Sequence, residues 1–146
     1  MSNTAKPLHI AFYHDAIIPP LKYGGTERII AWLIRELNQR GHRTTLIAKP
    51  GSTIDGTNCI SIAKHQDWRG VVPHDVDVLH LWSTPTTAPK IPYLVTIEGN
   101  GQPGEKFHPN TVFVSKKHAE NHSSRHFVYN GLDPSEFSAH IKRERH

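Results

Sequence analysis

One stretch near the amino terminus has the pattern of a strand, a helix and a second strand in quick succession. Residues 8–13 (LHIAFY) are apolar and β-prone, and residues 44–48 (TTLIA) are predicted to form another strand. Between them, apolar residues recur at the three-and-four spacing of an amphipathic helix, from Ile29 to Leu37. Thr26 is the expected N-cap of this helix and Gly41 its expected stop. A strand, helix and strand within about 40 residues predict parallel pairing with a right-handed crossover.

The rest of the chain continues this alternation of strands with helical or loop segments. A short helix is expected from a Ser115 cap to about Ser123. Further strands are expected at residues 59–63, 77–81, 93–97, 111–114 and 126–129. The pattern predicts an α/β fold with a doubly wound, mostly parallel, Rossmann-like sheet that is covered on both faces. We expect one domain over residues 1–137 and a basic tail or linker at 138–146.

Composition and charge exclude several classes of protein. With 36% hydrophobic and 21% charged residues, the chain is unlike a disordered, collagen-like or coiled-coil protein. The net charge of +4 suits anionic ligands, but no basic stripe interleaved with aromatic residues points to nucleic acid. Cys59 is the single cysteine, so a disulfide framework or Cys-rich zinc site cannot form within the chain. The polar start and the absence of a long apolar run lead us to expect a cytoplasmic protein.

Ligands of open parallel sheets bind at the carboxyl ends of the strands, so the residues that follow each strand are the candidate site residues. They are His14, Asp15, Gly24, Gly25, Trp82, Ser83, residues 98–101, Ser115, Lys116, Asn130 and Gly131. Gly24 and Gly25 precede a helix, where backbone N–H groups favour an anion such as phosphate. They could equally serve only a tight turn, and the loop lacks the lysine of a P-loop and the G-x-G-x-x-G spacing. Trp82 could stack on a sugar ring or be a core aromatic residue.

Histidines and aspartates elsewhere favour structural interpretations. His118, His122 and His126 would align for a metal on a continuous helix, but two serines interrupt that helix. Exposed surface histidines are therefore the preferred interpretation, and neither a metal nor a cofactor is expected. His80 lies in a predicted buried strand and is expected to be a core residue bonded to backbone. The aspartates of residues 75–77 precede that strand and are expected in a turn at the opposite end of the sheet from the site.

Five motifs occur in an order that resembles the N-terminal domain of family 4 glycosyltransferases, which have the GT-B fold. They are PLKYGGTERIIAWLIRELNQRGHRTTLIA (20–48), DVLHLWS (77–83), PYLVTIEGN (92–100), VFVSKKHA (112–119) and VYNGLDPSEF (128–137). The last is similar to the family's N-G-[VI]-D-x-x-x-F segment, which lies near the end of the N-terminal domain. Together the motifs cover nearly all of residues 8–137.

This resemblance implies a retaining enzyme that moves a sugar from a nucleoside diphosphate sugar to the hydroxyl of an acceptor sugar or lipid-linked acceptor. It implies donor diphosphate binding at Gly24, Gly25 and Thr26. The residues it implies on the acceptor side are His14, Asp15, Trp82, Asn100, Ser115 and Asn130. Glu98 is the candidate catalytic residue, but it stands where the family usually has a histidine. A carboxylate can accept a hydrogen bond from a sugar hydroxyl, but it cannot donate one as a neutral imidazole does.

In this fold a second Rossmann-like domain holds most of the donor nucleotide with a basic pair and an E-x7-E motif, and that domain lies beyond the stretch that the five motifs cover. The resemblance therefore implies an acceptor-side half that is inactive alone. It would be a fragment of a longer enzyme, or a partner chain would supply the donor domain. The alternative is a non-catalytic carbohydrate- or partner-binding module with the same fold.

Overall fold

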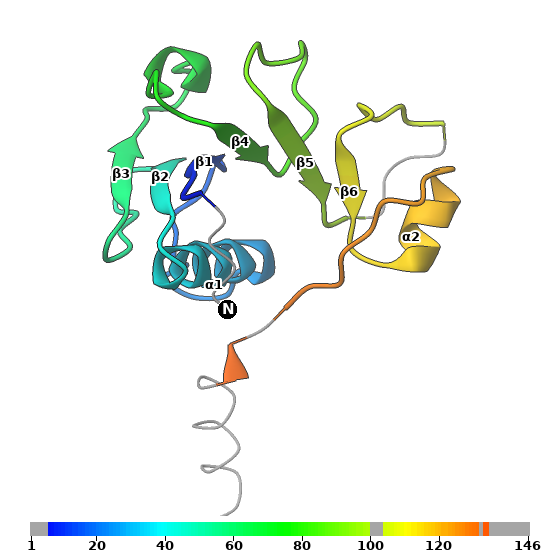
Figure 1. Cartoon of the computed structure of the whole chain (residues 1–146), viewed down its shortest axis with the longest axis horizontal. Coiled ribbons are helices and arrows are strands. Elements are labelled where there is room, and N and C mark those ends of the chain that lie inside the picture. Colours follow the sequence, from blue (N-terminus) through cyan, green and yellow to red (C-terminus); the bar gives the residue numbers. More distant parts are fainter. Residues whose placement is uncertain (1–5, 100–103, 132, 135–146) are drawn as a thin grey trace, which may run out of the picture.

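The computed structural model describes residues 6–99, 104–131 and 133–134. Within this part of the chain, six parallel strands form one sheet in the order β3-β2-β1-β4-β5-β6 (Figure 1). The strands are β1 (His9–Tyr13), β2 (Arg43–Ala48), β3 (Asn58–Ser61), β4 (Val78–Leu81), β5 (Tyr93–Ile97) and β6 (Thr111–Phe113). The helices are α1 (Gly25–Gln39), the 3-10 helix η1 (Trp68–Val71) and α2 (Lys116–Asn121). The prediction of a doubly wound, parallel, Rossmann-like sheet is confirmed.

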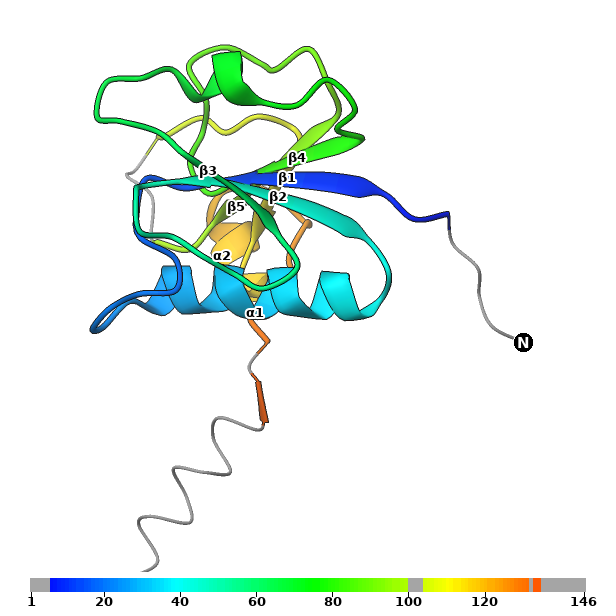
Figure 2. The ribbon, with the colours of Figure 1, turned by 90° about the vertical axis from the view of Figure 1, so that its left-hand side faces the viewer.

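The long helix α1 covers one face of the sheet over β1 and β2. Ile30 and Ile34 of the helix are fully buried, and they belong to the same core cluster as Phe12 of β1 and Leu46 of β2. Figure 2 shows α1 lying along one side of the sheet. Each fully buried side chain of this size contributes about 1.5–3 kcal/mol, so this cluster anchors the domain.

The opposite face is covered by connections rather than by long helices. Leu79, Leu81 and Val95 point to this face and pack against Trp68 of η1 and against Ile91 in the connection between β4 and β5. At the far edge, the rings of His118 in α2 and of His122 just after α2 contact Phe113 of β6. Between β3 and β5 the described chain has the 3-10 helix η1 but no longer helix, and this region is rich in Pro and Thr.

Two local predictions are wrong. Thr26 is not the N-cap, because the amide of Arg28 already donates to Gly24 O at 3.1 Å and α1 begins at Gly25 without a side-chain cap. Residues 126–129 do not form a seventh strand. They make one parallel bridge, between Phe113 and Phe127, before the chain turns toward α1. The expected tail at 138–146 lies outside the described residues, and no described helix is long and apolar enough to cross a bilayer.

A polar network ties the amino ends of three strands together. Buried His9 in β1 contacts Thr45 Oγ1 in β2 through Nε2 at 2.7 Å, and its Nδ1 lies 3.2 Å from Asp75 Oδ1. Asp77 Oδ2 accepts a hydrogen bond from the His9 amide at 2.7 Å, and Arg43 forms an ion pair with Asp75. Both aspartates thus lie at the amino edge of the sheet, as expected, where they connect the start of β4 to β1 and β2.

Asp75 gives this edge a pH dependence. Desolvation opposes ionisation, but the hydrogen bond and charge of Arg43 outweigh it and lower the pKa of the Asp75 carboxyl. A carboxyl whose folded-state pKa is lowered stabilises the fold above its ordinary pKa of 3.8, and this stabilisation is lost as pH falls through the folded-state value. Asp75→Asn should therefore lower the melting temperature slightly at neutral pH, and the difference should close in acid. Melting curves of both proteins across pH would measure this, and Asp55→Asn, at an exposed carboxyl, is the control.

Candidate functional site at the carboxyl edge of the sheet

The strand order reverses between β1 and β4, which pair side by side, so the loops that follow them diverge at one point of the carboxyl edge. His14 follows β1 and Trp82 follows β4, while Glu98 follows β5 and Ser115 is two residues beyond β6. The glycine pair begins α1 at this same end of the molecule, because α1 runs back from it toward the start of β2. These sequence-predicted residues are thus brought to one edge, where all of them except Ser115 belong to one of two groups.

The first group surrounds the glycine pair. Gly24 is extended, and a Cβ atom there would lie 2.9 Å from Pro20 Cβ and 2.8 Å from Glu27 Oε2. A Cβ on Gly25 would meet nothing within 4 Å. Gly24 is therefore needed for the close approach of the loop to the helix, whereas Gly25 leaves open space in front of the first turn. No described side chain caps α1, so the amides of this turn are available to a ligand.

His14 and Asp15 belong to this first group. His14 Nε2 lies 3.5 Å from Glu27 Oε1. The other oxygen of the Glu27 carboxylate, Oε2, lies 2.8 Å from the place that a Cβ on Gly24 would take. Asp15 is exposed, with its Oδ1 4.0 Å from Lys49 Nζ, a separation at which an exposed pair contributes little. The two side chains therefore border the glycine loop.

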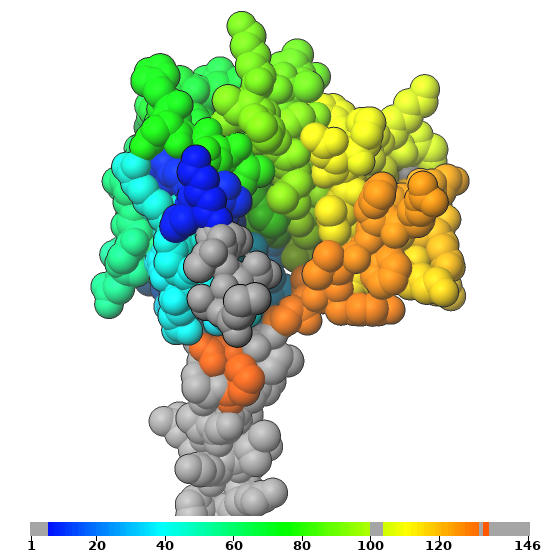
Figure 3. All heavy atoms as spheres, in the orientation of Figure 1, coloured from blue at the N-terminus to red at the C-terminus, as the bar shows by residue number. Residues whose placement is uncertain are grey.

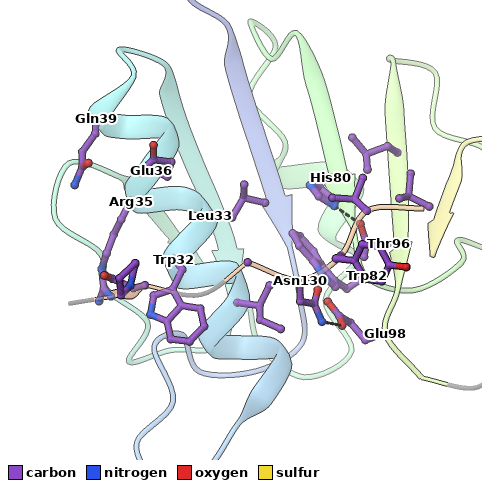
Figure 4. A pocket seen from close by; sticks show the side chains of 18 residues that line it. Trp32, Leu33, Arg35, Glu36, Gln39, His80, Trp82, Thr96, Glu98 and Asn130 are labelled. Atoms are coloured by element: carbon purple, nitrogen blue, oxygen red, sulfur yellow. Dashed lines mark hydrogen bonds between the residues drawn. The ribbon is translucent and has the colours of Figure 1, made fainter. Parts of the chain in front are cut away.

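The second group lines a groove of about 690 Å³ between α1 and the sheet (Figure 4). Strand register puts its floor on the face that α1 covers, because His80 pairs with Phe12 and with Leu94, and Thr96 pairs with Val112. Beyond β1 this face has no helix in the described structure. The floor residues are His80, Trp82, Leu94, Thr96, Glu98 and Val112, and the wall residues from α1 are Ile29, Trp32, Leu33, Arg35, Glu36 and Gln39. The segment that ends at Gly131 runs from the β6 side toward α1 and borders the opening (Figure 3).

Aromatic rings form the deepest part of this floor. The His80 and Trp82 rings stack with centroids 3.9 Å apart and planes 12° apart, and both contact Phe12. His80 Nε2 bonds Thr96 Oγ1 at 2.8 Å, so His80 is a mostly buried residue with a side-chain partner, not the backbone partner that was expected. Desolvation lowers the pKa of His80 to about 3, and the imidazole is neutral at physiological pH.

Glu98 and Asn130 meet at the carboxyl end of the groove. Asn130 Nδ2 donates to Glu98 Oε2 at 2.8 Å, as the dashed line in Figure 4 marks. The other carboxylate oxygen, Oε1, is buried and has no hydrogen-bond partner among the described residues, and the same is true of Trp82 Nε1. The carboxylate is therefore held at one oxygen and unsatisfied at the other, a state that costs free energy unless a further group binds there.

The remaining predicted residues lie elsewhere. Ser115 Oγ accepts a hydrogen bond from the His118 amide at 3.0 Å and caps α2. Asn100 lies outside the described residues. His118 is buried with its ring against Phe113, so the expectation that it is exposed on the surface is wrong. Across the described ranges, no group of three or more His, Cys, Asp or Glu side chains could hold a metal ion.

Sequence reasoning missed most of the groove. Residues after the strands were found because carboxyl ends are easily located, but the floor lies inside β4, β5 and β6. Its signal is the alternation of strand faces, by which Leu94 and Thr96 share a face with Glu98. The contribution of Trp32 and Leu33 could not be found in this way, because the sequence does not show which strands lie opposite each face of the α1 helix.

Comparison with known proteins establishes the fold. The chain matches no known protein-family model and no curated protein sequence. It superimposes on the crystal structure of AviGT4, a glycosyltransferase involved in avilamycin A biosynthesis, with a TM-score of 0.62 and 20% sequence identity. The match covers 88% of this chain and 44% of AviGT4, so the chain spans less than half the length of that protein. The fold is that of a Rossmann-like, glycosyltransferase-like half-domain.

The mostly buried His80 predicts a pH dependence of stability. Its folded-state pKa lies below its ordinary value of 6.5, so between about pH 6.5 and 3 the unfolded chain binds a proton that the folded chain does not. As the pH is lowered through that window, the free energy of unfolding should fall by up to about 1.4 kcal/mol per pH unit. His80→Gln should remove this part of the slope. Urea unfolding of both proteins between pH 7 and pH 4 measures it; the exposed His126→Gln is the control, and parallel curves for wild type and His80→Gln would contradict the prediction.

The two glycines should respond differently to a methyl group. Gly24→Ala forces Pro20 and Glu27 to move and should destabilise the fold by about 1–3 kcal/mol. Gly25→Ala meets open space and should be neutral or stabilising by about 0.4–1 kcal/mol. Denaturant unfolding of the two variants tests the contrast, and equal effects would show that the loop does not approach the helix as described.

Proposed function

We propose that the chain is the acceptor-side half of a retaining glycosyltransferase of the cytoplasm. A second domain or a partner chain would supply most of the donor site, and the chain alone would not complete the transfer. The observation that carries the proposal is the structural match to a glycosyltransferase over 88% of this chain. Retention, family 4 membership and a nucleoside diphosphate sugar donor rest on the resemblance of the five sequence motifs.

The donor diphosphate would lie against the first turn of α1. The amides of Gly25 and Thr26 lie at the positive end of a 15-residue helix, and open space in front of Gly25 admits a ligand to the backbone. This placement also suits the departure of a nucleoside diphosphate, whose negative charge develops at that position. Glu27 opposes it, because its carboxylate is close to Gly24 and would repel an anion.

The acceptor hydroxyl would bind at the carboxyl end of the groove. Glu98 Oε1 needs a donor, while Asn130 holds the other oxygen of the carboxylate. Trp82 borders the same groove, but it is a buried core residue whose ring stacks on His80. Glu98 would thereby act as the catalytic residue that orients the acceptor. Ser115 is a weaker candidate because its oxygen already caps α2, and Asp15 and His14 border the donor side more closely than this groove.

The proposal predicts that the chain binds nucleoside diphosphates through the glycine loop. Calorimetric titration with UDP, GDP, UDP-glucose and GDP-mannose should show binding of at least one ligand at about millimolar affinity or tighter. Gly25→Val fills the open space and should weaken this binding by about tenfold or more, because the side chain excludes the diphosphate. Glu27→Gln removes the adverse charge and should strengthen it.

Gly70→Val is the matched control, since Gly70 is also exposed with open space around it but lies in η1. Circular dichroism would establish that each variant is folded. Absence of binding by the folded wild-type chain, or binding that Gly25→Val leaves intact, would contradict the assignment of the loop to the donor diphosphate.

A further inference from the structure

The groove between α1 and β4–β6 combines an apolar body with polar side chains toward both ends. Leu94 and Val112 on its floor are only partly buried, and Leu33 and Trp32 of α1 contribute apolar walls. Glu98 lies just after the end of β5. Figure 4 shows it apart from Glu36 and Gln39, which belong to the last turn of α1. The groove therefore differs chemically along its length.

The size of the groove suits a small molecule. Ligand pockets typically enclose about 300–1,000 Å³ and are lined mainly by apolar and aromatic side chains with a few polar groups that set orientation. The volume here, about 690 Å³, falls in that range. Partly buried apolar side chains on a sheet face gain stability when a ligand removes them from water.

The end of the groove at Glu98 restricts the chemistry of the ligand. Glu98 Oε1 needs a hydrogen-bond donor and Trp82 Nε1 needs an acceptor, and neither has a partner among the described residues. A hydroxyl group can supply both functions, whereas a phosphate or carboxylate would be repelled by the Glu98 carboxylate. Both atoms are shielded from water, so groups next to them must move before a ligand can bond them; the exposed Asn130 side chain, which bonds the other oxygen of the same carboxylate, also lines the groove.

We propose that the groove binds a neutral amphiphile whose hydroxylated head lies at Glu98 and whose aliphatic part lies along Leu94 and Val112. An alkyl glycoside or a related hydroxyl-bearing lipid has this chemistry. The inference rests on the proposed function and deepens it, because it makes such a molecule the acceptor class.

The test uses probes that separate the two parts of the ligand. Octyl β-D-glucoside, kept below its micelle-forming concentration, should bind at least about tenfold more tightly than methyl β-D-glucoside, because only the former fills the apolar body. Octyl sulfate should bind more weakly than octyl glucoside, and Glu98→Gln should remove that preference. Indole fluorescence reports occupancy directly, since Trp32 and Trp82 both line the groove while Trp68 packs on the opposite face.

Leu94→Trp fills the groove with an apolar side chain and should abolish octyl glucoside binding while leaving the melting temperature close to that of the wild type. Leu8→Trp, at a partly exposed leucine outside the groove, is the matched control and should bind normally. Equal affinities for octyl and methyl glucoside, or octyl binding that survives Leu94→Trp, would overturn the proposal. So would a wild-type dimer in light scattering that Leu94→Trp dissociates, because a second copy would then cover the groove.

The same samples keep this inference separate from the proposed function. Nucleoside diphosphate binding depends on Gly25 and should be unaffected by Leu94→Trp. Failure of the wild-type chain to bind octyl glucoside, while it binds diphosphates, would overturn the acceptor class alone. Loss of diphosphate binding with retained glucoside binding would overturn the donor assignment and leave an amphiphile-binding groove.

Discussion

The right-handed crossover between parallel strands is the constraint on which the rest of the structure depends. It places α1 on one face as the chain moves from β1 to β2, and it places the later connections on the other face as the chain moves from β4 to β6. The reversal between β1 and β4 creates the divergence of loops at the carboxyl edge. Among the described residues, it also leaves the α1-side face of β4, β5 and β6 without a crossover helix. The candidate donor loop and the groove therefore have a common origin in chain topology.

α1 connects these two features. Its inner side, with Ile30 and Ile34, is fully buried against β1 and β2 and fixes the helix on the sheet. Its first turn faces the glycine loop, and Trp32 and Leu33 form a wall of the groove. One helix thus carries both the turn proposed to bind the diphosphate and a wall of the groove proposed to bind the acceptor.

Much of the fold was predictable because local patterns and topology agreed. The apolar spacing within α1 and the β-prone segments gave the sheet, and β5 was located at its observed bounds, Tyr93–Ile97. The cap at Thr26 failed because Gly24, free of a side chain, lets the helix begin earlier than the preference of threonine for caps suggests. The prediction of a seventh strand was wrong because residues beyond Val128 leave β6 and run to the groove. That path depends on tertiary contacts, which β-propensity does not encode.

The candidate site was only partly predictable for the same reason. Glu98 and Trp82 could be found from the ends of their strands. The hydrogen bond between Glu98 and Asn130 joins residues 32 positions apart and follows from where the crossing segment lies. The burial of His80 against Trp82 required the strand register, and the burial of His118 required the packing of α2 on Phe113. Sequence patterns locate strand ends well, but they do not determine which side chains a later segment will cover.

The central claim is that one edge of this domain holds a donor diphosphate and an acceptor hydroxyl at separate positions. The most direct measurement is an amide and indole NMR titration of the ¹⁵N-labelled chain with UDP and octyl β-D-glucoside, added separately and together. The account predicts that UDP shifts the amides at the start of α1 and that the glucoside shifts the Trp82 indole, with both sets present in the mixture. Shifts confined to the amino edge around His9 and Asp75, or competition between the two ligands for one set of resonances, would contradict it.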